Sequence, residues 1–149
     1  MPVDPTSARL QRIAAELRAT GQGALLNSLR AEIRAEAAPA VKAVREAALE
    51  KLPKRGGLAA EQAEQAIRVS VLASARTAGV RMRTRTRGSF QTDKGYVRHP
   101  VFGDREDWVR QDVPQATGWW TKTLLELGPV TTARLRALIE RLNRRIQAM

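Results

Sequence analysis

The chain has 149 residues, enough for one compact domain with its own core, and 43% of them are hydrophobic. It has no cysteine, which excludes disulfides, thiolate zinc sites and thiol nucleophiles, and its single histidine argues against a His-based metal site. The net charge of +11 points instead to a polyanionic partner or to an acidic protein surface.

Membrane insertion and secretion are not indicated by the sequence. No stretch approaches the roughly 20 consecutive apolar residues of a membrane span. Residues 1–10 also lack the apolar core of a signal peptide. We therefore expect a soluble protein of intracellular origin that has no membrane partner.

Residues 1–52 are predicted to form a helical arm. Apolar residues recur at helical spacing from Leu10 to Leu17, and again over about 24–52. Pro39 lies inside the second pattern, where proline removes a backbone hydrogen bond and clashes with the preceding turn. Because the apolar register continues across it, we expect one long helix, kinked near Pro39.

Residues 53–114 are predicted to form loops and a small antiparallel sheet. Apolar and polar residues alternate on both sides of a short link, which predicts a β-hairpin at about 67–87. Residues 88–95, rich in Gly, Ser, Thr and Asp, are typical of an exposed loop. Two further extended pieces follow, and Pro100 in the first one favours an edge strand or an irregular strand.

Residues 115–149 are predicted to form a C-terminal amphipathic helix, which makes the whole chain a single α+β domain. Trp119 and Trp120 are adjacent, so both rings cannot be buried on one helix face. We expect Trp119 to be exposed or buried by a partner subunit. Trp108, which shares a strand face with Arg110, is expected to anchor the sheet against a helix.

Basic residues concentrate between Glu64 and Asp93, where the sequence has no acidic residue. If residues 80–87 are extended, four arginines point to one face and form a cationic ribbon about 20 Å long. Like charges at every second residue of a strand repel one another. This repulsion favours an anionic partner over a merely solvated face. The candidate anion-binding or interface residues are Arg76, Arg81, Arg83, Arg85 and Arg87.

Catalytic and cofactor-binding patterns are weak. The sequence has no phosphate-binding glycine loop, and we expect no cofactor and no bound metal. Asp104, Glu106 and Asp107 cluster near His99 and offer either an acid–base pair, a cation site or a solvated turn. One functional hypothesis is a small basic DNA- or RNA-binding protein that contacts phosphates through the arginine hairpin. Without a recognition helix or interleaved aromatic residues, such a protein would contact phosphates with little sequence preference.

Several stretches together resemble the head–tail joining proteins of long-tailed bacteriophages, variously called neck, tail-completion or minor tail proteins. These stretches are "LPKRGGLA", a β-hairpin, "VRHPVFGDREDWVRQDV" and "GWW" leading into the last helix, so the resemblance covers about Leu52 to the C-terminus. Its most specific part is "RHPVFG" with a tryptophan a few residues later. We call these residues the signature: Arg98, His99, Pro100, Val101, Phe102, Gly103 and Trp108.

The resemblance implies a non-enzymatic virion protein, made in the host cytoplasm, which forms a ring of six subunits in the phage neck. Its neighbours would be the head-closure or connector proteins and the tail-terminator or tail-tube proteins, with non-specific contact to passing DNA. The signature would form a structured turn at the sheet edge, and His99 would need no catalytic role. The arginine strand would face either an acidic neighbouring subunit or DNA, and we expect the neighbouring subunit.

Overall fold

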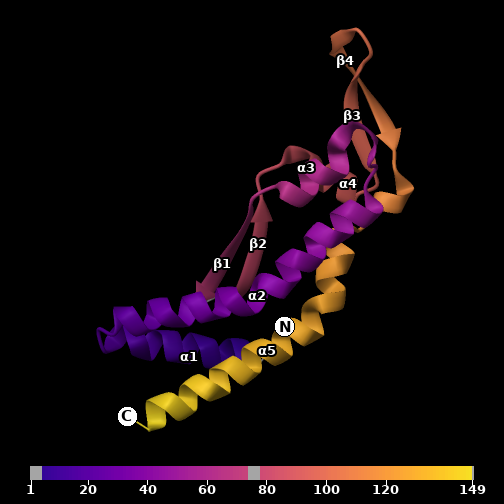
Figure 1. The fold of residues 1–149 in the computed structure, drawn as a ribbon. Coiled ribbons are helices and arrows are strands. Elements are labelled where there is room, and N and C mark those ends of the chain that lie inside the picture. The colour runs from indigo at the N-terminus through magenta and orange to yellow at the C-terminus, as the bar shows by residue number, and fades with distance from the viewer. Residues whose placement is uncertain (1–4, 74–77, 149) are drawn as a thin grey trace. The chain divides into compact units, whose positions relative to one another are not determined.

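The computed structural model describes residues 5–73 and 78–148 and has an α+β fold (Figure 1). The helices are α1 (Pro5–Ala19), α2 (Gly23–Lys51), α3 (Leu58–Glu64), α4 (Arg87–Asp93) and α5 (Thr121–Gln147). The strands are β1 (Ile67–Ala73), β2 (Ala78–Thr84), β3 (Tyr96–Val101) and β4 (Asp104–Asp112). Short 3-10 turns lie at Arg55–Gly57 and Pro114–Ala116.

Internal contacts divide the chain into two compact units. The first unit comprises Met1–Pro39, Arg68–Arg83 and Gly128–Met149, and the second comprises Ala40–Ile67 and Thr84–Leu127. Each unit therefore draws on all three consecutive segments expected from the sequence. Both long helices contribute to both units, and the chain passes between the units beside Pro39 in α2 and just before Pro129 in α5.

Three helices and the first hairpin form the core of the first unit. The apolar stripe predicted for α1 is buried as expected, and it packs against apolar residues of α2 and α5. Val71 and Val80 of the hairpin are partly buried against the same cluster. The buried residues are Leu10, Ile13, Ala14, Leu17, Leu26, Leu29, Ile33, Leu138 and Ile139.

The α2 segment is one continuous helix of 29 residues with Pro39 inside it. The prediction of a single helix is confirmed, because apolar positions continue on both sides of the proline and pack in both units. The helix ends before Pro53, as expected. Among the helices of the described residues, none is long and apolar enough to cross a membrane.

A tryptophan lies in the core of the second unit. Trp119 is completely buried, and the neighbouring Trp120 packs edge-on against it, with ring centroids 5.7 Å apart. The expectation that Trp119 is exposed was wrong, because α5 begins only at Thr121 and the two rings lie in the preceding turn. The other buried members of this core are Val44, Ala48, Leu52, Ala59, Ala63, Val113 and Ala116.

The segment expected to be an exposed loop, residues 88–95, contains most of α4. Its Ser89 and Thr92 side chains are buried, and the Ser89 hydroxyl donates to a side-chain oxygen of Gln62 in α3. The Thr92 hydroxyl bonds backbone carbonyls of its own helix and accepts the indole N–H of Trp119 at 2.9 Å. The loop prediction failed because these polar residues are satisfied inside the protein rather than by solvent.

The strands form two separate two-stranded antiparallel sheets, β1–β2 and β3–β4, rather than one small sheet. The first hairpin also ends earlier than predicted, at Thr84 rather than 87. The Thr84 hydroxyl donates to Gln65, which lies just before β1, and its oxygen accepts the backbone N–H of Thr86. These hydrogen bonds lie at the end of β2, and α4 begins at Arg87.

The start of α5 is held by the end of α4. The Asp93 carboxylate accepts the backbone N–H groups of Trp120 and Thr121 at 2.8 and 3.0 Å. The Asp93 carbonyl accepts the N–H of Gly118 at 2.7 Å. Because the first N–H groups of a helix have no partners within it, this carboxylate acts as a cap from another part of the chain.

Replacing Asp93 by Ala should lower the free energy of unfolding by about 1–2 kcal/mol, since two N–H groups at the start of α5 lose their acceptor. Urea unfolding followed by circular dichroism measures this loss. The Asp93→Asn variant keeps one acceptor oxygen and should lose less. The Asp107→Ala variant, at an exposed position, should match the unmodified chain. Equal stability of Asp93→Ala and Asp107→Ala would contradict the capping role.

Candidate subunit interface

The β3–β4 hairpin carries the signature and extends from the part of the second unit that contains α3 and α4 (Figure 1). Its base is closed by the N–H of Val113, which donates to the Gly95 carbonyl at 2.7 Å. The Arg110 guanidinium lies 4.2 Å from the centre of the Tyr96 ring and bonds the Asp112 carboxylate at 2.9 Å. The base of the hairpin is therefore fixed by several independent contacts.

The tip of the hairpin is irregular but ordered by its own hydrogen bonds. Pro100 pairs with Trp108 while Val101 pairs with Asp104, so residues 105–107 bulge out of β4. The Trp108 indole donates to the Arg105 carbonyl at 3.0 Å, and the Asp104 carboxylate accepts an N–H from within the bulge at 2.8 Å. Gly103 completes the turn with a positive φ of 87°, which glycine adopts without steric cost.

Most of the hairpin is exposed, including its apolar residues. Every residue of β4 is exposed, and so are the last four residues of β3. Phe102 at the tip is fully exposed, and Trp108 is 51% exposed. The expectation that Trp108 anchors the sheet against a helix was therefore wrong. Its backbone pairs with Pro100 in the hairpin, and Pro100 lies on an edge strand of the two-stranded sheet.

The candidate acid–base residues lie on the same hairpin, and all of them are exposed. His99 is exposed, and its Nδ1 lies 3.1 Å from the carbonyl oxygen of Pro100. Asp104, Glu106 and Asp107 are exposed around the bulge. Across the described residues, no group of three or more His, Cys, Asp or Glu side chains is arranged to hold a metal ion.

The predicted ribbon of four arginines is not formed. Arg81 and Arg83 are exposed on β2, two residues apart, as predicted for one face of a strand. Arg85 is exposed but follows the end of the strand, and Arg87 is the first residue of α4. Arg76 lies outside the described residues. The alternating pattern was therefore correct for two of the arginines and wrong for the two that follow Thr84.

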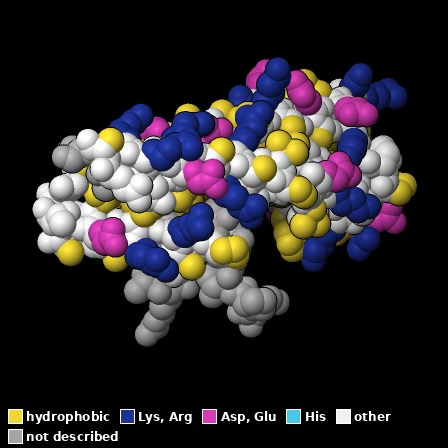
Figure 2. Space-filling model, turned by 90° about the horizontal axis from the view of Figure 1, so that it is seen from below, with side chains coloured by type: hydrophobic (Ala, Val, Ile, Leu, Met, Phe, Trp, Pro, Cys, Tyr) yellow, Lys and Arg dark blue, Asp and Glu magenta, His cyan; other side chains and the backbone are white. Residues whose placement is uncertain are grey.

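Positive charge is distributed very unevenly between the two units. The first unit has 14 basic against 5 acidic residues, a net charge of +9, and the second has 12 against 10, a net charge of +2. All 14 basic residues of the first unit are arginines. Figure 2 shows Lys and Arg side chains spread over one face of the molecule, with Asp and Glu side chains among them. Arginine offers a planar set of donors that matches carboxylates, so this composition favours contact with anionic groups.

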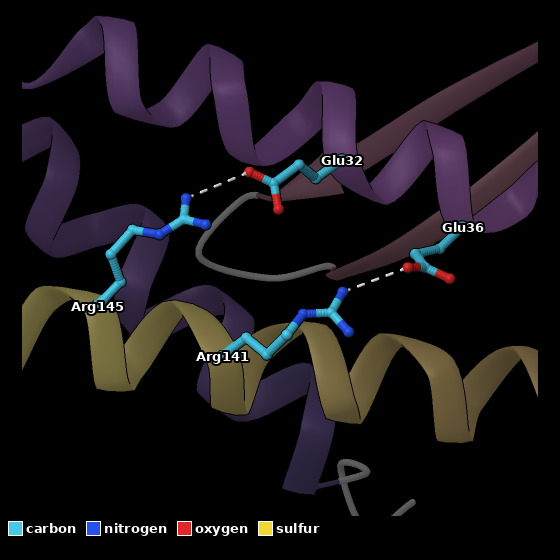
Figure 3. Close-up of polar contacts among 4 residues, drawn as sticks. All are labelled: Glu32, Glu36, Arg141 and Arg145. Atoms are coloured by element: carbon cyan, nitrogen blue, oxygen red, sulfur yellow. Dashed lines mark hydrogen bonds and ion pairs between the residues drawn. The ribbon is translucent and has the colours of Figure 1, made fainter.

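Two ion pairs join α2 and α5 within the first unit (Figure 3). Glu36 lies 3.4 Å from Arg141, and Glu32 lies 3.8 Å from Arg145. The two glutamates are four residues apart on α2, and the two arginines are four residues apart on α5. Each helix therefore presents both of its charges on one face. At this exposure each pair contributes about 0.2–1 kcal/mol, and the guanidinium groups keep donors for further partners.

A shallow apolar hollow lies beside the Glu32–Arg145 pair in the first unit. It has a volume of about 40 Å³ and lies among α1, α2 and α5. Its lining is mainly leucine and isoleucine, together with Ser28, Glu32 and Arg145. The apolar lining residues are Ile13, Leu17, Leu25, Leu29 and Leu142.

Neither the hollow nor the ion pairs were predicted from the sequence. The sequence did contain a signal for the ion pairs, because Glu32 and Glu36 are four residues apart, as are Arg141 and Arg145. That spacing places both charges of a helix on one face. The hollow had no such signal, since its leucines belong to ordinary core-facing stripes. The signature residues were singled out by resemblance, but their exposure was not predicted.

Comparison with known proteins identifies no relative. No family model matches the chain, and no curated protein or solved structure matches it at a significant level. Its function must therefore be inferred from its own residues and geometry.

The two aromatic residues that differ most in burial give a test of which residues maintain the fold. Phe102→Ala should change the free energy of unfolding by no more than about 0.5 kcal/mol, because its ring is fully exposed. Trp119→Ala should cost about 3–5 kcal/mol, because it empties a buried site and removes a hydrogen bond. Denaturant unfolding compares the two. A loss at Phe102 close to that at Trp119 would show that the hairpin tip is part of the folded core.

Proposed function

We propose that this chain is a structural subunit of the neck of a long-tailed bacteriophage. In this proposal, copies assemble into a homo-oligomeric ring, of six subunits by resemblance, which joins the head to the tail and leaves a channel for the genome. The neighbours are the head-closure or connector proteins on one side and the tail-terminator or tail-tube proteins on the other. The protein acts in the virion and catalyses no reaction.

The observation that carries the proposal is the exposure of the signature. The residues that resemble the neck proteins most closely lie at the outer part of a hairpin, and they contribute little to either core. A fully exposed phenylalanine at a well-ordered turn forgoes roughly 1.5–3 kcal/mol of burial energy in the isolated chain. Exposed aromatic residues on a rigid element are well suited to anchor a contact between proteins.

Nucleic-acid binding is the second candidate, and it is favoured by the net charge of +9 on the first unit. Its original support was the ribbon of four arginines, of which only Arg81 and Arg83 lie on the strand. It also leaves the exposed aromatic tip unexplained. We therefore rank it below the assembly role.

Particles made without this protein should accumulate as separate heads and free tails, because the ring that joins them is missing. Electron microscopy of lysates measures the fraction of joined particles, which should fall to near zero and recover when the protein is supplied. Joined, infectious particles in its absence would contradict the neck role.

Random duplex DNA gives the corresponding test of the second candidate. Binding should be weak and should decline steeply with salt, because only phosphates are contacted. Because we expect the arginine strand to face a neighbouring subunit, substituting Arg81 and Arg83 by Gln should reduce particle assembly more than it reduces DNA affinity. A loss of particles in step with a loss of DNA affinity would favour the nucleic-acid role instead.

A further inference from the structure

The tip of the β3–β4 hairpin combines an apolar residue with concentrated negative charge. Residues 104–107 hold three carboxylates and one arginine, the densest acidic group in a strongly basic chain. Phe102 lies two residues before Asp104 and is fully exposed. The bonds from Trp108 and to Asp104 hold the bulge in shape, so little conformational entropy remains to be lost when the tip binds.

The hollow of the first unit combines an apolar lining with an exposed arginine, which complements the apolar and acidic hairpin tip. Its lining is apolar except for Ser28, Glu32 and Arg145, and the Arg145 side chain is 68% exposed and lies 3.8 Å from a Glu32 oxygen. A cavity of roughly 150 Å³ admits a whole benzene ring, so a hollow of about 40 Å³ receives only the edge of one. The rest of the ring would be covered by the side chains around the hollow, including Leu25, which is 40% exposed.

From this complementarity we infer that the hairpin tip of one copy docks into the α1–α2–α5 hollow of a second copy. Phe102 covers the apolar lining, and the carboxylates of residues 104–107 face Arg145, the arginine that lines the hollow. The two surfaces differ, so each copy offers one of each, and the contact repeats from copy to copy. Such a head-to-tail contact closes into a ring when the rotation allows, which is how this inference extends the proposed function.

Charge argues for a second copy of this chain rather than DNA as the occupant of the hollow. The acidic tip brings carboxylates to a unit whose basic residues are all arginines, a match suited to bidentate pairing. Duplex DNA would meet the arginines through its phosphates, but its bases are stacked inside the helix and project no aromatic ring that could enter the hollow. The tip itself would repel DNA, because residues 104–107 have a net charge of −2.

The contact is small, since it uses one hairpin tip and one hollow. Interfaces at the small end of the known range are generally weak, so self-association should depend on protein concentration. Part of the attraction is between charges near the surface, so it should also weaken as salt is raised. Both dependences are measurable by sedimentation velocity.

The test uses two substitutions, each directed at one of the two surfaces. Phe102→Asp changes the tip and Leu25→Asp changes the hollow, and both positions are exposed enough for the fold to tolerate the change. Each variant alone should self-associate at least about 30-fold more weakly than the unmodified chain, as expected when a central contact residue is lost. A mixture of the two should form a dimer and nothing larger, because each such pair retains one intact tip and one intact hollow.

Matched controls use exposed apolar residues elsewhere. Phe90→Asp and Leu125→Asp alter residues that are 65% and 75% exposed and belong to neither surface. Both should associate like the unmodified chain, and unfolding curves confirm that all four variants fold. A chain that stays monomeric at every concentration, or variants that associate normally or fail to pair when mixed, would overturn the inference.

The same variants separate this inference from the proposed function. If Phe102→Asp restores joined particles fully when supplied to particles lacking the protein, the docking contact is wrong while the neck role stands. If particles join without the protein at all, the neck role is wrong whatever the variants do in solution. If Leu25→Asp abolishes binding to duplex DNA but leaves self-association intact, the hollow belongs to a nucleic-acid surface and the inference fails.

Discussion

The capping of α5 by Asp93 is the contact on which the arrangement of the second unit depends. This carboxylate holds the start of α5, and the Asp93 carbonyl holds Gly118 in the turn before it. The same turn buries Trp119, whose indole bonds Thr92 of α4. Helix α4 leads directly into β3 through Gly95, where a Cβ would lie 2.3 Å from the Thr117 hydroxyl oxygen. One compact junction therefore fixes both helices and the base of the exposed hairpin.

This junction explains how a small protein can present apolar residues on an exposed hairpin. The base is closed at Val113 and by Arg110 with its two partners, and the tip is closed by the Trp108 indole. Phe102 is thereby held out of the core. The energy of folding comes from the two buried clusters, while the signature remains free for another role. We regard contact between subunits as that role.

Periodic sequence patterns predicted the parts of the fold that depend on one buried face. The stripe from Leu10 to Leu17 and the continuity of α2 through Pro39 followed from spacing alone. The failures at residues 88–95 and at Trp119 share a cause, which is side-chain contact between distant segments. Ser89 and Thr92 looked like loop residues, but their hydroxyls are bonded inside the protein, and Trp119 was misplaced because the start of α5 depends on Asp93. At the candidate interface, the sequence identified Phe102 and Trp108 but not their exposure, since a strand pattern does not reveal whether anything covers it.

The absence of cysteine from the sequence allows a direct measurement of the proposed contact. A Phe102→Cys variant and a Leu25→Cys variant, mixed and mildly oxidised, should form a disulfide-linked dimer on a denaturing gel. Neither variant should reach that yield alone, and Leu125→Cys in place of Leu25→Cys should give no dimer with Phe102→Cys. Cross-linking of Phe102→Cys only to itself, or equal yields with both leucine positions, would show that the hairpin tip does not dock into the hollow of a second copy.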